Sequence, residues 1–207
     1  MSKRSGFSKY HRKETGQSIY CYEGTDILIN KENIKDAKAL ADYEADITLI
    51  RQYELEKEQP IRGRFGVAHI KNIHRYIFQD IYPFAGKFRT ENIKKGSTEF
   101  CKSRFIQENL EVIFCELKRD RFLKVLTADE FSQMAAYYLS EINMIHPFRE
   151  GNGRTIREFI RQLALKCGLI INWSLIDKEK LLEAIIISVD KKYGPLAECI
   201  LQSIENK

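Results

Sequence analysis

The stretch that decides the fold and the chemistry of this chain reads His146-Pro147-Phe148-Arg149-Glu150-Gly151-Asn152-Gly153-Arg154-Thr155-Ile156-Arg157. It gathers a histidine, an acidic residue, a Gly-Asn-Gly turn and two arginines. Apolar residues recur at helical spacing after the turn, so we expect a helix that begins near Gly151 and ends at Gly168. The stretch is therefore predicted to collect polar groups at the N-terminus of a helix.

That helix N-terminus is predicted to bind a nucleotide polyphosphate. Its first backbone amides have no partner inside the helix and lie at the positive end of the helix dipole. Gly151 and Gly153 let the backbone approach a ligand closely, and Asn152 can add a side-chain donor. Arg154 and Arg157 share one face of the helix, where guanidinium groups can hold phosphate oxygens. The alternative is a pair of solvated arginines on an outer face.

Three further residues complete the predicted chemistry. Glu150 is a candidate Mg²⁺ ligand, because this ion takes one or two carboxylates together with substrate phosphates and water; alternatively it only complements the helix dipole. His146 is the candidate general base, and Pro147 is expected to hold it on an extended backbone. Phe148 is expected to anchor the loop in the core.

Composition excludes several other classes of protein. The 207 residues are 43% hydrophobic and carry a net charge of +5 without a dense basic block, so nucleic acid is not an expected partner. No apolar run suggests a membrane span or a secretory signal, and the separated cysteines are typical of reduced thiols. We expect a cytoplasmic protein, with secretion by another signal left open. His69 and His74 are five positions apart and are interpreted as structural.

Hydrophobic periodicity predicts an all-α bundle with one β-hairpin. Helices are expected at about residues 33–55, with Asn30 or Asn33 as N-cap, and at 67–78, 103–119, 128–144, 151–168, 177–189 and 194–204. The pattern Thr127-x-x-Glu130 predicts a capping box. Residues 87–101 lack helical periodicity and are expected to form the hairpin, with its turn at Gly96. Residues 1–18 are interpreted as a flexible basic arm before a single domain at 19–207.

The quoted stretch resembles the complete signature of the Fic (filamentation induced by cAMP) family, His-Pro-Phe-x-Glu-Gly-Asn-Gly-Arg-x-x-Arg. Residues 81–89 resemble the family's segment before its flap hairpin, although Phe84 stands where tryptophan is usual. Residues 92–96 resemble the flap itself, and residues 20–30 resemble the N-terminal part of stand-alone bacterial Fic toxins. The resemblance covers about residues 19–204 and implies the Fic helical fold.

The resemblance also implies transfer of AMP from ATP to a tyrosine, serine or threonine hydroxyl of a target protein. By this resemblance, His146 would deprotonate the hydroxyl and Glu150 would hold Mg²⁺ at the α- and β-phosphates. The phosphates would be bound by Gly151, Asn152, Gly153, Arg154 and Arg157. The flap would pair with an extended target segment as an added strand through Ile93, Lys94, Lys95, Gly96, Ser97 and Thr98.

Two features of the family pattern concern donor and regulation. Family members with lysine at the second glycine act as kinases, and Gly153 argues against that activity. The family's inhibitory pattern, [Ser/Thr]-x-x-x-Glu-[Gly/Asn], is absent from the chain, so we expect a small antitoxin, or a part outside this chain, to place a glutamate against Arg157. Type II topoisomerase subunits are candidate targets by analogy. Transfer of UMP, GMP or phosphocholine, kinase-like transfer, and a non-catalytic nucleotide-binding module remain alternatives.

Overall fold

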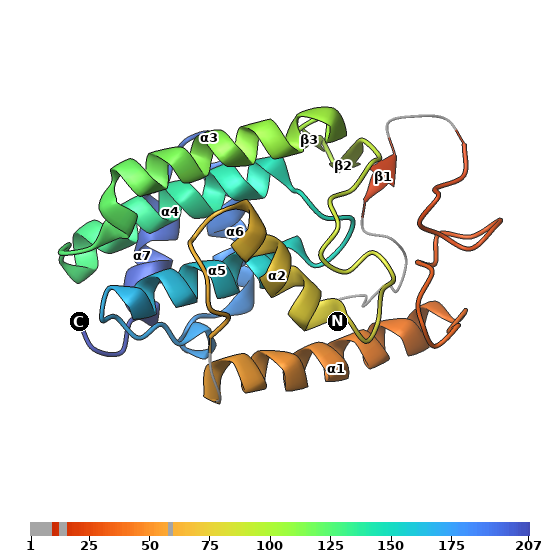
Figure 1. Ribbon diagram of the computed structural model, residues 1–207, viewed down its shortest axis with the longest axis horizontal. Coiled ribbons are helices and arrows are strands. Elements are labelled where there is room, and N and C mark those ends of the chain that lie inside the picture. Colours follow the sequence, from red (N-terminus) through yellow and green to blue (C-terminus); the bar gives the residue numbers. More distant parts are fainter. Residues whose placement is uncertain (1–9, 13–15, 58–59) are drawn as a thin grey trace.

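A computed structural model describes residues 10–12, 16–57 and 60–207. These residues form the predicted helical bundle with a small antiparallel sheet (Figure 1). The helices are α1 (Ala37–Lys57), α2 (Val67–Phe78), α3 (Ile106–Arg119), α4 (Ala128–Ile145), α5 (Asn152–Lys166), α6 (Lys178–Ser188) and α7 (Gly194–Ser203). The strands are β1 (His11–Arg12), β2 (Ile93–Lys95) and β3 (Thr98–Glu99). No helix in the described ranges is both long and apolar enough to cross a membrane.

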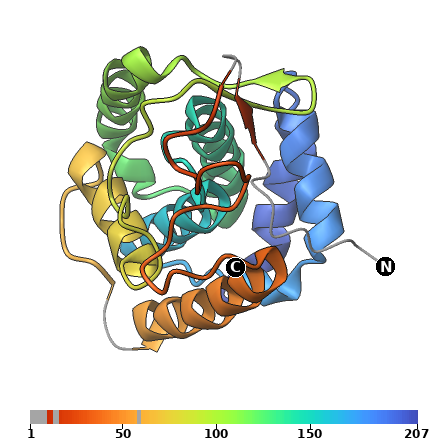
Figure 2. The same ribbon diagram turned by 90° about the vertical axis from the view of Figure 1, so that its right-hand side faces the viewer.

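Helix α5 occupies the middle of the bundle, with α2 and α4 packed against it (Figures 1 and 2). Its apolar stripe is buried as the sequence predicts, and Ile156, Phe159, Ile160 and Leu163 expose at most 1% of their surface. Helix α4 also packs against α3 and α7. Because α5 is surrounded in this way, its N-terminus is fixed relative to the ends of α2 and α4.

The helix boundaries follow local capping, with one correction. Helix α1 begins later than expected, because Asp36 rather than Asn30 or Asn33 supplies the cap and accepts a hydrogen bond from the Ala39 amide at 2.8 Å. The capping box at Thr127 and Glu130 is confirmed.

The predicted hairpin is confirmed at β2 and β3, where Lys94 pairs with Glu99 and Lys95 with Thr98 around Gly96. Strand β1 was not predicted. It pairs antiparallel with β2, with His11 opposite Lys94 and Arg12 opposite Ile93. The expected arm is described at residues 10–12 and 16–18, and in both places the chain contacts the domain; residues 1–9 and 13–15 lie outside the described residues.

His69 is an unusual member of the core. It exposes 2% of its surface and lies between the rings of Phe65 and Phe159. Burial lowers its pKa from 6.5 to about 4, with Gln162 opposing and Lys166 reinforcing the shift. The imidazole is therefore neutral in the folded protein at neutral pH.

This burial predicts a loss of stability in mild acid. Below pH 6.5 the unfolded chain binds a proton at His69 that the folded chain rejects until about pH 4, so the free energy of unfolding falls as the pH drops through this window. We expect His69 to account for about 1 kcal/mol of the loss between roughly pH 7.5 and 5.5. Urea denaturation at both values should show a smaller loss for His69→Leu; an equal loss in both proteins would contradict the assignment.

Candidate functional site

His146 ends helix α4 in the left-handed conformation, with φ 50° and ψ 62°. Its backbone amide donates to the Ile142 carbonyl at 3.0 Å. The expectation of an extended backbone before Pro147 is wrong. Proline disfavours the right-handed helical region for the residue before it, and here the helix stops through the left-handed region instead. Such strain in a non-glycine residue is typical of functional sites.

The tautomer of His146 follows from its partners. Its Nδ1 lies 2.9 Å from the Asn143 carbonyl, which can only accept a hydrogen bond, so Nδ1 carries the proton. Nε2 is then the unprotonated nitrogen, and it accepts from the Tyr10 hydroxyl at 2.8 Å. A general base that takes a proton from a hydroxyl requires this arrangement.

Aromatic rings fix the plane of the imidazole. The Phe100 ring stacks on His146 with centroids 3.8 Å apart, and the Tyr10 ring meets it edge-on at 5.0 Å. Burial lowers the pKa of His146 to about 3; the hydrogen bond to Asn143 opposes this shift, and the charges of Arg89 and Lys95 reinforce it. The imidazole is therefore neutral at pH 7 and can accept a proton.

Arg89 joins the flap, about residues 91–101, to the loop that carries His146. Its guanidinium is buried and donates to the carbonyls of Glu91 (2.6 Å), His146 (2.8 Å), Ile145 (3.2 Å) and Cys101. Glu91 and Cys101 bracket the flap, whereas Ile145 and His146 lie at the C-terminal end of α4, where the helix dipole favours a cation. One side chain therefore holds both ends of the flap against the candidate base.

The Asn152 side chain closes the motif loop, which is formed by residues 146–151 between α4 and α5. Its carboxamide accepts from the Phe148 amide and donates to the Phe148 carbonyl, each at 2.8 Å. The hydrogen bonds of this predicted phosphate donor therefore serve mainly to shape the loop. Phe148, the expected anchor, has no exposed surface and stacks on His74 at 3.8 Å.

Glu150 lies at the start of α5 with 7% of its surface exposed. Its Oε1 accepts from the Gly151 amide at 3.0 Å and lies 3.8 Å from Arg154. Its other oxygen has no hydrogen bond to a described residue. No group of three or more His, Cys, Asp or Glu side chains within the described ranges could hold a metal ion. Glu150 nevertheless fits an Mg²⁺ ion that takes its remaining ligands from phosphates and water.

The two motif arginines have different surroundings. Arg154 is ion-paired with Glu44 at 2.5 Å and donates to Thr48 at 3.0 Å, both on α1. Arg157 makes no hydrogen bond or ion pair through its guanidinium with a described residue. Burial lowers its pKa to about 10, and repulsion by Arg154 adds to the shift. A half-buried cation without an acidic partner among the described residues favours the binding of an anion at this position.

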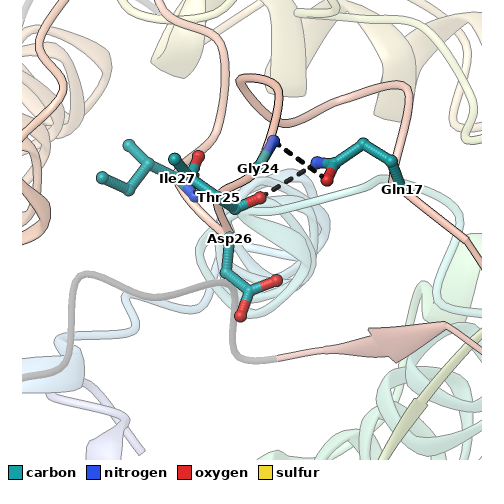
Figure 3. A pocket seen from close by; sticks show the side chains of 5 residues that line it. All are labelled: Gln17, Gly24, Thr25, Asp26 and Ile27. Atoms are coloured by element: carbon teal, nitrogen blue, oxygen red, sulfur yellow. Dashed lines mark hydrogen bonds between the residues drawn. The ribbon is translucent and has the colours of Figure 1, made fainter.

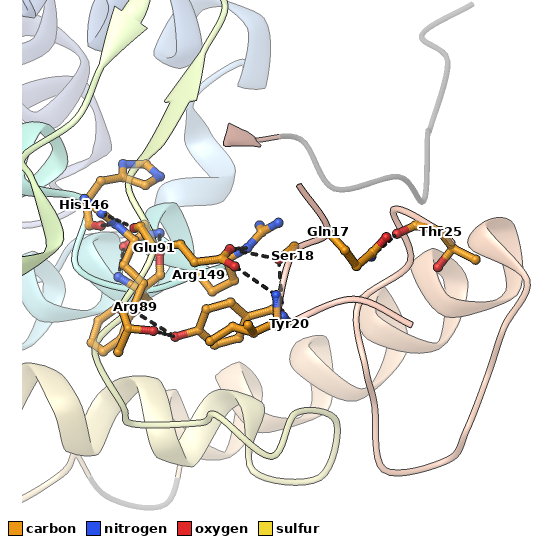
Figure 4. Close-up of polar contacts among 12 residues, drawn as sticks. Gln17, Ser18, Tyr20, Thr25, Arg89, Glu91, His146 and Arg149 are labelled. Atoms are coloured by element: carbon orange, nitrogen blue, oxygen red, sulfur yellow. Dashed lines mark hydrogen bonds and ion pairs between the residues drawn. The ribbon is translucent and has the colours of Figure 1, made fainter. Parts of the chain in front are cut away.

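A second set of contacts joins residues 18–20 to the motif loop (Figure 4). The Glu91 carboxylate accepts from the Ser18 hydroxyl at 2.8 Å and from the Ile19 amide at 2.9 Å, and it lies 3.8 Å from Arg149. The Arg149 guanidinium also lies over the Tyr20 ring at 5.9 Å. Sequence reasoning missed Arg149 because it fills the variable position of the motif.

His74 is another residue whose role the sequence did not reveal. It is fully buried; its Nδ1 accepts from the Gly86 amide at 2.8 Å and its Nε2 donates to the Glu150 carbonyl at 3.0 Å. Burial lowers its pKa to about 3, so it remains neutral. The signal in the sequence that could have revealed this role is a polar residue between Ile73 and Ile77 on the apolar face of α2.

A cavity of about 470 Å³ lies outside this constellation (Figure 3). It is lined by Gln17, Gly24, Thr25, Asp26 and Ile27. The Gln17 amide donates to the Thr25 carbonyl at 3.0 Å and its carbonyl accepts from the Gly24 amide at 3.2 Å. Asp26 is the single ionisable side chain in this lining, so the lining offers no pair of groups for acid–base chemistry.

Comparison with known proteins agrees with this geometry. A family model described as Fic/DOC matches residues 64–164. Protein adenylyltransferase VbhT of Bartonella schoenbuchensis is 40% identical over 87% of this chain, which spans 37% of that protein's length. The probable protein adenylyltransferase y4lH of Sinorhizobium fredii is 35% identical, and the match covers 89% of this chain and 94% of that protein.

One solved structure is similar to this protein over most of the length of both chains. The N-terminal Fic domain of a VirB-translocated Bep effector protein from Bartonella quintana, crystallised with bound ADP, has a TM-score of 0.82 and 27% sequence identity. The match covers 89% of this chain and 94% of that one. This similarity places the helical bundle and its flap in a known fold.

The motif loop yields a matched pair of glycine substitutions. Gly151 and Gly168 have φ of 80° and 82°, so alanine should cost each about 1–2 kcal/mol in backbone strain. A Cβ at Gly151 would also lie 2.2 Å from the Phe78 ring, whereas at Gly168 it meets nothing within 4 Å. We expect Gly151→Ala to lose about 1–3 kcal/mol more than Gly168→Ala in urea denaturation. Equal losses would show that the loop does not depend on this contact.

Proposed function

The chain belongs to the Fic/DOC family, and from that premise we propose that it is a protein adenylyltransferase, which transfers AMP from ATP to a tyrosine, serine or threonine hydroxyl of a target protein. The observation that carries this proposal is the unprotonated Nε2 of His146, which already accepts a hydroxyl hydrogen bond at 2.8 Å beside the N-terminus of α5. The names of the related adenylyltransferases and the ADP-bound neighbour support it.

The phosphates of ATP bind at the start of α5 in this proposal. The amides of Gly151 and Gly153 would bind phosphate oxygens, the Gly151 amide in exchange for its hydrogen bond to Glu150. Asn152 shapes the loop that presents them. Arg157 supplies the cation without an acidic partner among the described residues, whereas Arg154 contacts a phosphate while it stays ion-paired with Glu44. Positioning and charge neutralisation are the main needs of phosphoryl-type transfer.

Glu150 is the proposed carboxylate for Mg²⁺. Its position directly before the phosphate-binding amides would let its carboxylate hold the ion next to the phosphates. When bound, Mg²⁺ would neutralise negative charge on those phosphates. The hydrogen bond from His74 to the Glu150 carbonyl holds this residue in place.

The transfer step places the acceptor hydroxyl between His146 and the α-phosphate. The hydroxyl oxygen bonds to the α-phosphorus, the bond from that phosphorus to the bridging oxygen breaks, and pyrophosphate leaves. The hydroxyl proton passes to Nε2 of His146. The Asn143 carbonyl, which accepts from Nδ1, stabilises the imidazolium that forms.

The acceptor segment is proposed to bind along the flap. Ile93, Lys94 and Lys95 form β2, and Ser97 and Thr98 follow the turn at Gly96. A target strand would displace β1, pair with the edge of β2 that β1 occupies in this structure, and so present its hydroxyl to His146.

The nucleotide donor is the point on which alternatives remain. UMP, GMP or phosphocholine transfer uses the same diphosphate contacts, and kinase-like transfer would present the γ-phosphate instead. A non-catalytic nucleotide-binding module is the alternative outside catalysis. Gly153 favours nucleotidyl transfer, and a side chain there would come within 3.3 Å of the Arg157 guanidinium.

Regulation is proposed to act at Arg157. A small antitoxin could place a glutamate against this cation and so occupy the site of a phosphate. The protein would then act in the bacterial cytoplasm as the toxin of a toxin–antitoxin pair, with type II topoisomerase subunits as first candidate targets by analogy.

A labelling experiment tests the proposed reaction. We expect ATP labelled at the α-phosphate, with Mg²⁺ and a bacterial lysate, to label a protein, and ATP labelled at the γ-phosphate to leave it unlabelled. His146→Ala should abolish the label because no base accepts the proton. Excess unlabelled UTP, GTP or CDP-choline should compete poorly. Label from the γ-phosphate would indicate a kinase, and label that survives His146→Ala would exclude this base.

A further inference from the structure

We propose that Tyr10 is an intramolecular acceptor of the nucleotidyl group, because strand β1 occupies the flap as a target strand would and places the Tyr10 hydroxyl on the base. The inference rests on the proposed function, since it uses the same donor and the same His146. It adds a modification site within the chain itself.

The first support is the position of the phenol. Tyr10 exposes 8% of its surface, and its hydroxyl donates to Nε2 of His146 at 2.8 Å. The Tyr10 ring also contacts Phe100 at the end of the flap, with centroids 6.1 Å apart. A tyrosine on the base nitrogen, with its ring held by the flap, has the geometry expected of an acceptor residue.

The second support is the pairing of the backbone. His11 and Arg12, which follow Tyr10 directly, pair antiparallel with Lys94 and Ile93 of β2. This is the edge on which an extended target segment is proposed to bind. A strand added to this edge carries the neighbouring side chain to His146, so the chain presents its own hydroxyl in the manner proposed for a target.

The third support is the surroundings of the hydroxyl on the phosphate side. Burial and then the charge of Glu150 raise the pKa of Tyr10, while a hydrogen bond with the Asn152 side chain and the charges of Arg154 and Arg149 oppose the shift. These partners belong to the motif, residues 146–157. The phenol therefore keeps its proton at neutral pH while its hydroxyl is hydrogen-bonded to the base.

The tether makes this geometry persistent. The Glu91 carboxylate, two residues before β2, holds the Ser18 hydroxyl and the Ile19 amide, at 2.8 and 2.9 Å. Only five residues separate Arg12 from Ser18, so β1 cannot travel far from the flap. A tethered acceptor has a high effective concentration and competes with any separate target for the same edge.

The proposed step balances as a substitution at phosphorus. The Tyr10 oxygen bonds to the α-phosphorus of ATP, and the bond from that phosphorus to the oxygen it shares with the β-phosphorus breaks. Pyrophosphate leaves with the electron pair, and the phenolic proton passes to His146. The product is a phosphodiester between Tyr10 and AMP.

The test uses the full chain with Mg²⁺ and ATP labelled at the α-phosphate, without any other protein. We expect label on the peptide that contains Tyr10, as mapped by mass spectrometry. Tyr10→Phe and His146→Ala should lose this label, whereas the matched control Tyr53→Phe, at an exposed tyrosine of α1, should keep it. The fraction labelled at a fixed time should not change when the protein is diluted, because the reaction is intramolecular.

Each other outcome overturns the inference. Label that persists in Tyr10→Phe, or that maps to another residue, shows a different acceptor, and a labelled fraction that falls on dilution shows transfer between molecules. If the wild-type chain labels a lysate protein but never itself, β1 only blocks the flap and the proposed function stands. If it labels neither, the proposed function fails as well. Thermal melting of Tyr10→Phe, which lacks a single oxygen, checks that the fold is retained.

Discussion

The arrangement of the site depends on one buried guanidinium. Arg89 donates to carbonyls at both ends of the flap and at the end of α4. No acidic side chain lies opposite it in these contacts, so backbone carbonyls and the α4 dipole stabilise its charge. Burial lowers the pKa of Arg89 to about 10, which leaves it charged at neutral pH. The Arg89 side chain thereby ties the flap to His146, together with the Cys101 amide on the Met144 carbonyl and the Phe100 ring on the imidazole.

The base, the motif loop and β1 are positioned around the fixed flap. The Asn143 carbonyl selects the tautomer of His146, and Asn152 folds the motif loop so that α5 begins beside the base. Glu91 then holds residues 18 and 19 at the base of the flap, and β1 lies along the flap edge. The base, the anion-binding helix end and a strand-binding edge therefore meet at one place, which suits transfer to a hydroxyl on an extended segment.

Much of the fold could be predicted from the sequence, because apolar periodicity and capping are local signals. The stripes of α2 and α5, the capping box of α4 and the hairpin turn at Gly96 all lie where those signals place them. The missed features depend on distant partners. The left-handed His146, the carbonyl contacts of Arg89, the packing of Arg149 and the position of β1 are fixed by tertiary packing, which no local pattern encodes. The motif could name the residues at the start of α5, but it could not show that Arg154 is engaged by α1.

The most direct measurement is a crystal structure with Mg²⁺ and an ATP analogue in which a methylene group bridges the α- and β-phosphates, so that transfer cannot occur. We predict that the amides at the start of α5 bind the phosphates and that Glu150 binds Mg²⁺. The α-phosphorus should lie about 3–3.5 Å from a hydroxyl that is hydrogen-bonded to Nε2 of His146. A γ-phosphorus facing His146, or a nucleotide in the cavity beside Gln17, would contradict AMP transfer at this site.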